Sequence, residues 1–105
     1  MPRQAAKMDS NQPDIVQALR DVGATVFVLA RVGQGIPDLA VGYRGRNYFL
    51  EVKNLDGRGD KLTPAEKEFF DTWHGQAAVV RNEAEALAVI GAAEYRIEYN
   101  GEGTA

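Results

Sequence analysis

A β-hairpin signal constrains the fold of this chain more than any other feature of its sequence. Two segments rich in β-branched and aromatic residues, 36–43 and 47–53, flank a short bend that contains Gly45. Such segments around a glycine-containing bend predict two antiparallel strands joined by a tight turn. If the turn has two central residues, Gly45 and the one before it, residues whose numbers add up to 89 face each other. This register places Asp38 directly opposite Glu51.

The same register sorts the hairpin side chains onto two faces. Side chains alternate along a strand with period two, so Lys53 shares a face with Glu51. A one-residue slip would mix the two sets. On one face, which is apolar, we expect Leu39, Val41, Tyr43, Tyr48, Leu50 and Val52. On the other face we expect Asp38, Ala40, Gly42, Phe49, Glu51 and Lys53.

Asp38, Glu51 and Lys53 are the candidate catalytic residues. Charged groups near a core are costly unless they are paired, so we expect a cation and a negatively charged substrate to meet between them. Mg²⁺ and Mn²⁺ suit such a site, because they prefer oxygen ligands and usually keep several waters. A bound cation lowers the pKa of its water, and a lysine can stabilise the extra negative charge. The pattern predicts a metal-dependent phosphodiesterase site.

A simpler interpretation of the same three residues stays open. Lys53 can bridge Asp38 and Glu51 as an ordinary cross-strand ion pair on a solvated sheet face. Taken alone, the spacing Glu-x-Lys occurs by chance in most charged proteins. The sequence therefore also admits a non-catalytic domain that binds DNA or another protein and keeps the same fold.

Three segments resemble the signature of VRR-NUC domains, a family within the PD-(D/E)XK nuclease superfamily. They are residues 35–39 (Gly-Ile-Pro-Asp-Leu), 45–53 (Gly-Arg-Asn-Tyr-Phe-Leu-Glu-Val-Lys) and 62–64 (Leu-Thr-Pro). The similarity extends from about residue 11 to residue 91. The chain looks most like the minimal, stand-alone VRR-NUC proteins of bacteriophages and bacteria, in which the domain is the whole polypeptide.

The resemblance implies a divalent-metal nuclease that acts on DNA. It implies that Asp38, Glu51 and the Val52 carbonyl are metal ligands, and that Lys53 lies beside the attacking water. Junction or flap cleavage is implied by the resemblance alone, because nothing in the residues themselves distinguishes a linear from a branched duplex. The chain departs from the family at Glu66, where relatives commonly carry glutamine.

Further polar residues are candidates for contacts around the metal. Glu66 is the third residue of a predicted helix, so it either satisfies the Thr63 backbone amide or, from a helix end beside the site, contacts the metal shell. Asn11, Gln12 and Asp14 belong to the first predicted helix, from which related nucleases often take an acidic or amide group. Periodicity does not choose among these residues.

Hydrophobic periodicity predicts an α/β fold of the restriction-endonuclease-like type, with a mixed central sheet flanked by helices in the order α-β-β-β-α-β-α. We expect three helices, capped at their starts by Ser10 or Asn11, by Thr63 and by Asn82, and ending near Gly23, Gly75 and Gly91. The predicted strands cover residues 25–30, 36–43, 47–53 and 77–80. The last strand is wholly apolar, so we expect it to be covered on both faces.

We expect one nuclease domain, residues 10–92, between a flexible N-terminal segment, residues 1–9, and a short C-terminal tail or edge strand, residues 93–105. With 105 residues and 45% hydrophobic content, the chain can bury a single core. It contains no cysteine, which is compatible with the reducing cytoplasm of a bacterium or a phage-infected cell. No signal peptide or bilayer-spanning segment is evident, so we expect no membrane partner.

The distribution of charge bears on DNA binding. The formal net charge of the chain is -3, whereas DNA-binding domains are often basic. Residues 31–67 nevertheless contain seven basic and five acidic side chains, which gives this segment a net charge of +2. We expect DNA contacts from Gln34, Arg44, Arg46, Arg58 and Lys61, and an affinity that falls with added salt.

The helix predicted after Thr63 carries an aromatic stripe formed by Phe69, Phe70 and Trp73. Helical spacing of this kind is more typical of a core or a subunit interface than of a platform for base stacking. So much aromatic surface on one short helix suggests a homodimer. A homodimer would also present two cleavage centres to a branched duplex.

Overall fold

The computed structural model describes residues 10–54 and 61–92. Within them the chain forms its elements in the predicted order α-β-β-β-α-β-α: α1 (Gln12–Asp21), β1 (Thr25–Val28), β2 (Leu39–Tyr43), β3 (Arg46–Val52), α2 (Pro64–Thr72), β4 (Gln76–Val80) and α3 (Glu83–Val89). None of the helices in this described part is long and apolar enough to cross a membrane. The segment 1–9, Arg58 and the tail or edge strand 93–105 lie outside the described residues.

The strands form one mixed sheet in the order β1-β2-β3-β4. β1, β2 and β3 are antiparallel neighbours, and β4 lies parallel to β3. The pairs Leu39↔Leu50 and Tyr43↔Arg46 confirm the predicted hairpin register. Arg44 and Gly45 both have positive φ angles, 51° and 80°, as a two-residue type I′ turn requires. The predicted α/β class with a mixed sheet is therefore confirmed.

The connection from β1 to β2 is longer than predicted, because β1 ends at Val28 instead of residue 30 and β2 begins at Leu39 instead of residue 36. Gly33, Gln34 and Gly35 have positive φ angles of 72°, 59° and 83°, which are incompatible with an extended strand. A side chain at Gly35 would place its Cβ 2.5 Å from the Ala65 carbonyl oxygen, in the first turn of α2. Only glycine permits this approach, so Gly35 brings the start of α2 against the connection that leads into β2.

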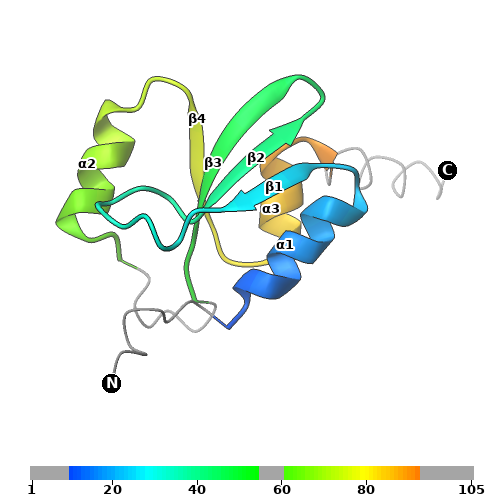
Figure 1. The fold of residues 1–105 in the computed structure, drawn as a ribbon, viewed down its shortest axis with the longest axis horizontal. Helices are drawn as coiled ribbons and strands as arrows, with labels where there is room; N and C mark the ends of the chain where they lie inside the picture. The colour runs from blue at the N-terminus through cyan, green and yellow to red at the C-terminus, as the bar shows by residue number, and fades with distance from the viewer. Residues whose placement is uncertain (1–9, 55–60, 93–105) are drawn as a thin grey trace, which may run out of the picture.

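α1 and α3 pack against each other on one side of the sheet, which we call the closed face (Figure 1). Hydrophobic side chains from both helices and from the strands are buried there. They include Ile15, Val16, Leu19, Leu39, Val41, Tyr48, Leu50, Val52, Val80, Ala86, Leu87 and Ile90. The predicted apolar face of the hairpin is thereby confirmed, although Tyr43 is only half-buried.

α2 lies on the opposite side of the sheet, which we call the open face (Figure 1). The rings of Phe69 and Trp73 meet the Phe49 ring of β3 edge-on, with centroids 5.6 and 5.0 Å away. No residue of α2 is buried, and Trp73 keeps 44% of its surface exposed. The aromatic stripe is therefore not a core helix face within the described part of the chain.

Two expectations about the elements are wrong. β4 is not covered on both faces: only Val80 is buried, because α2 leaves this side of the sheet partly open. Asn11 occupies the N-cap position of α1 without capping it, since its side chain donates to backbone carbonyls of other elements. The capping box of α2 and the cap of Asn82 on α3 are confirmed.

Candidate active site

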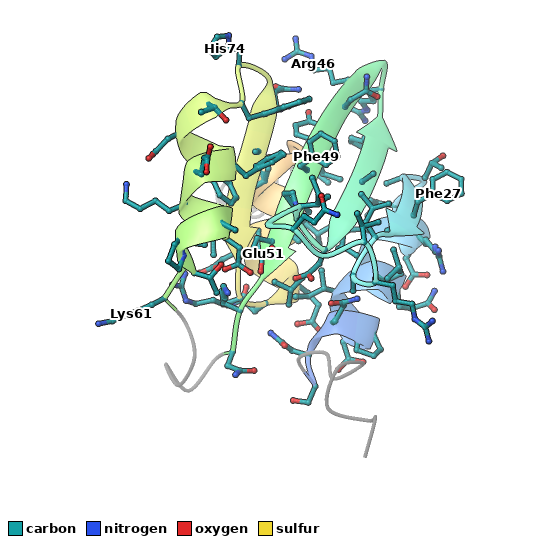
Figure 2. All side chains as sticks on the ribbon, turned by 60° about the vertical axis from the view of Figure 1, so that its left-hand side comes forward. Phe27, Arg46, Phe49, Glu51, Lys61 and His74 are labelled. Atoms are coloured by element: carbon teal, nitrogen blue, oxygen red, sulfur yellow. The ribbon has the colours of Figure 1, made fainter. Side chains whose placement is uncertain are left out.

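Charged side chains converge on the open face where β3 ends. Glu51 and Lys53 are buried, with 4% and 7% of their surface exposed. The Lys53 ammonium nitrogen lies 3.3 Å from Glu51 Oε2 and 2.9 Å from Oε1 of Glu66, which comes from α2. Figure 2 shows Glu51 between the sheet and α2. The structure thus brings together two hairpin residues and a helix residue that lies 13 positions from Lys53 in the chain.

Asp38 joins this group from the neighbouring strand. It precedes β2, and continuing the register by one residue places it opposite Glu51. Its Oδ2 atom accepts a hydrogen bond of 2.8 Å from the Val52 backbone amide, which ties the Asp38 carboxylate to the end of β3. We refer to Asp38, Glu51, Lys53 and Glu66 as the charged cluster.

The charged cluster holds more negative than positive groups, and the pKa of Glu51 reflects this. Burial of its carboxyl group and the neighbouring charges of Asp38 and Glu66 raise the pKa of Glu51 to about 8, while Lys53 offsets only part of the effect. A divalent cation beside Glu51 would oppose the repulsion among the acids. The raised pKa of Glu51 thus follows first from its burial and then from the acids around it.

Lys53 and Glu66 stabilise each other in their charged forms. Burial acts to lower the pKa of Lys53, but its hydrogen bond to Glu66 and the charges of both glutamates outweigh burial and raise it. Burial acts to raise the pKa of Glu66, but hydrogen bonds from the Thr63 amide and from Lys53 outweigh it and lower the pKa. One atom, Glu66 Oε1, accepts from both donors at 2.9 Å. Glu66 thus caps its helix, as one of its two interpretations held, and also contacts a candidate catalytic residue.

A metal ion in this cluster would use few protein ligands. Among residues 10–54 and 61–92, no three His, Cys, Asp or Glu side chains are arranged to hold a metal. Asp38 and Glu51 supply carboxylate oxygens from opposed positions of the hairpin. Mg²⁺ and Mn²⁺ need little more from a protein, because waters and substrate phosphates complete their shells. The donor chemistry fits these ions, and the Val52 carbonyl stays a predicted ligand.

The start of α1 is linked to the charged cluster through the side chain of Asn11. Its Nδ2 donates to the Lys53 carbonyl at 3.0 Å and to the Arg81 carbonyl at 2.6 Å, which connects the start of α1 to the ends of β3 and β4. Its Oδ1 is buried without a hydrogen-bond partner among the described residues. Gln12 is buried in α1, whereas Asp14 is exposed. The structure thus separates three candidates that sequence reasoning treated alike.

The described residues among those predicted to contact DNA lie outside the charged cluster. Arg46 and Lys61 are exposed and lie on opposite sides of Glu51 (Figure 2). The Arg44 guanidinium lies over the ring of the preceding tyrosine, 5.2 Å from its centroid. Gln34 is exposed in the connection between β1 and β2. None of these four described residues belongs to the charged cluster, in which Lys53 is the basic member.

Sequence reasoning missed a groove of about 890 Å³ on the open face, which we call the aromatic groove. It lies over β1, β2 and β3 beside the end of α2, and Phe27, Phe49 and Trp73 line it. Ala40 and Gly42 were the available signal, because their side chains are too small to fill the space between larger neighbours on the same face.

Comparisons of the chain with protein-family models, with curated proteins and with solved structures gave no match. The resemblance to VRR-NUC domains therefore rests on the motif residues alone. The geometry of the charged cluster is the observation from which a function can be argued.

Proposed function

We propose that this chain is a divalent-metal-dependent DNA endonuclease with a restriction-endonuclease-like fold, similar to stand-alone VRR-NUC domains. The observation that carries the proposal is a buried lysine and a buried glutamate, Lys53 and Glu51, next to two more carboxylates on one side of the sheet. Buried charge is costly in a small domain. Binding of a cation and a phosphodiester would account for keeping it there.

The proposal gives the metal ligands one role and Lys53 another. Asp38 and Glu51 would hold Mg²⁺ or Mn²⁺, with the Val52 carbonyl as a further ligand. When bound, the cation supplies a Lewis acid for the phosphate and a water of lowered pKa. Lys53 would stabilise the negative charge that develops on the phosphate oxygens.

Two further residues would position Lys53 for this role. Glu66 holds the Lys53 ammonium group through a 2.9 Å hydrogen bond. The side-chain amide of Asn11 holds the Lys53 backbone by donating a hydrogen bond to the Lys53 carbonyl. A long lysine side chain loses much rotational freedom when it is fixed in this way, so these contacts would prepare its geometry before substrate binds.

DNA is the proposed substrate because exposed basic residues lie in both directions from the charged cluster, Lys61 before α2 and Arg46 at the opposite end of β3 (Figure 2). Contacts of this kind to phosphates would weaken as salt is added. Preference for a junction or flap extends the proposal from the VRR-NUC resemblance, and action as a homodimer would present two cleavage centres to such a branched duplex. We also propose the cytoplasm as its location, which suits a cysteine-free chain.

Cleavage assays test this proposal directly. Plasmid, flap and four-way-junction DNA would be incubated with the protein in Mg²⁺, in Mn²⁺ and in EDTA. We expect cleavage only with metal, and a rate at least about a hundredfold lower for Lys53→Met, which keeps the length of the side chain and removes its charge. Failure of the wild-type chain to cut any of the three DNAs with either metal would contradict the proposal.

One observation favours a second candidate, a non-catalytic interaction domain. Lys53 already pairs with Glu51 and Glu66 inside the chain, as in an internal ion-pair network. Thermal melts with and without Mn²⁺ distinguish the two candidates. A cation site stabilises the folded state by about 2.7 kcal/mol at a metal concentration a hundred times the Kd, whereas an internal ion-pair network predicts no rise in Tm.

A further inference from the structure

We propose that the aromatic groove binds unpaired nucleotides of the DNA strand that is cut, by stacking their bases on its aromatic side chains. The inference rests on the proposed nuclease function and extends it, because it names the form of DNA that the open face recognises. Single-stranded nucleotides next to the cleaved phosphodiester, as in a flap, are the class of ligand.

The strand pairing explains why the groove exists. Thr25 lies opposite Gly42, and Phe27 lies opposite Ala40. The two small residues form the floor of the groove, while the phenylalanine stands on one side of it with 66% of its surface exposed. An aromatic ring beside an open floor leaves its flat side available to another ring.

The other side of the groove is aromatic as well. Phe49 and Trp73 line it, and their rings meet edge-on with centroids 5.0 Å apart. Trp73 also stacks on Phe69 at 5.3 Å, which fixes the orientation of its ring although 44% of the residue is exposed. Preordered aromatic rings bind nucleobases with little sequence preference, because every base has a π-face.

The groove and the charged cluster occupy one continuous surface. Phe49 and Glu51 are two residues apart on β3, so their side chains point to the same face about 7 Å apart along the strand. Figure 2 shows Phe49 over the sheet, on the same strand as Glu51. A strand whose phosphodiester lies at the charged cluster would therefore place its next nucleotides over the groove.

The end of the groove away from the charged cluster offers polar side chains that could contact a nucleotide. Arg46 and Asn47 line it there, and Arg46 is exposed. An arginine at one end, with aromatic rings along the sides, matches a nucleotide, whose phosphate is negative and whose base is flat. The volume of about 890 Å³ lies in the usual range for small-ligand sites.

A second copy of the chain is the competing occupant, and the described surface favours it less. Among residues 10–54 and 61–92, the exposed large hydrophobic side chains are Phe27, Val28, Val32 and Trp73. Phe27 and Trp73 are the sides of the groove itself. The two valines are short and offer no flat group to insert between aromatic rings.

The single tryptophan of the chain gives a direct test, because Trp73 lines the groove. A short oligothymidylate would be titrated into the Lys53→Ala protein with Mg²⁺ present, and Trp73 fluorescence would be followed. We expect quenching by the single strand but not by a duplex of equal length. Phe27→Ala and Ala40→Leu, the second of which fills the groove, should each weaken binding about tenfold.

Val32→Ala is the matched control, since it removes an exposed apolar side chain outside the groove and should leave binding unchanged. Circular dichroism would establish that each variant folds. Absence of quenching, or quenching that neither groove variant weakens, would overturn the inference. So would a dimer in light scattering that Ala40→Leu converts to a monomer, because the groove would then hold a second copy.

The binding assay does not depend on cleavage, so the two proposals can fail separately. Quenching with no cleavage by the wild-type chain would support the groove and contradict the nuclease. Cleavage without quenching would support the nuclease and contradict the groove.

Discussion

The closed and open faces of the sheet differ in what they bury. The closed face buries hydrophobic side chains of α1, α3 and the strands. The open face buries two charged residues, Glu51 and Lys53, and leaves Phe27 and Trp73 exposed. Burial of apolar surface drives folding, whereas buried charge and exposed aromatic rings oppose it. The contrast indicates that the closed face stabilises the domain, and it supports our proposal that the open face carries the function.

The largest effect that would test this contrast is expected from Asp38→Asn. The change removes a negative charge from the charged cluster, so we expect loss of metal binding together with a fall in cleavage of at least about a thousandfold. Cleavage assays and Mn²⁺-dependent melting would measure the two effects. Asp14→Asn, at an exposed position of α1, is the control. If the Asp38→Asn variant still cleaved DNA, Asp38 would no longer be assigned to the active site.

Leu50 and Phe49 allow the two faces to be compared at neighbouring positions of one strand. Leu50 is buried on the closed face, so Leu50→Ala should lower the free energy of unfolding by about 2–5 kcal/mol. Phe49 is only half-buried on the open face, so Phe49→Ala should cost less, about 1–2 kcal/mol. Urea denaturation would measure both. Equal losses would show that the open face contributes as much to stability as the closed one.

A substitution at Gly35 tests whether the close approach of α2 to the β1–β2 connection stabilises the domain and keeps Glu66 in contact with Lys53. Gly35→Ala puts a Cβ 2.5 Å from the Ala65 carbonyl oxygen at a positive φ angle, so we expect a loss of about 1–3 kcal/mol in stability. Displacement of α2 should also loosen the contact of Glu66 with Lys53 and slow cleavage. Gly33→Ala is the matched control, because its φ is also positive but nothing lies within 4 Å. A larger loss in the Gly33 variant would contradict this assignment.

The two faces also differ in how far the sequence predicts them. The closed face and the hairpin register follow from local rules, namely the alternation of side chains and the two-residue turn at Gly45. The positions of Asp38, Glu51 and Lys53 follow from the same register. The contact of Glu66 with Lys53 depends on how α2 docks, which periodicity does not specify. The aromatic groove was missed because it arises from the small size of the side chains at Ala40 and Gly42, which periodicity does not register.

The pKa of Glu51 predicts how stability changes with pH in the metal-free protein. Its folded-state value of about 8 exceeds the ordinary 4.5, so its stabilising effect is full below pH 4.5 and is lost as the pH rises through 8. The raised pKa of Lys53 acts only above its ordinary 10.5, and the lowered pKa of Glu66 acts only toward acid. Between pH 5 and 8 the free energy of unfolding should therefore fall.

The slope of that fall has an upper bound of about 1.4 kcal/mol per pH unit, the value for one proton. Urea denaturation at several pH values would measure it. Glu51→Gln, which cannot ionise, should flatten the profile, and added Mg²⁺ should reduce the loss by binding the ionised cluster. A wild-type slope no steeper than that of the glutamine variant would show that Glu51 ionises normally.

The smallest effect is expected from Glu66→Gln, which introduces the residue that VRR-NUC domains, the family the chain resembles, commonly carry at this position. Glutamine keeps a side-chain oxygen that can accept from the Thr63 amide and from Lys53, so the helix cap and the position of the ammonium group should persist. Loss of the charge should cost about 1 kcal/mol in stability. Cleavage should change by less than about fivefold, whereas Glu66→Ala, which removes the acceptor, should slow it more. A glutamine variant as inactive as Asp38→Asn would instead show that the charge of Glu66 is needed at the metal, and the open face would then use three acids where we assign two.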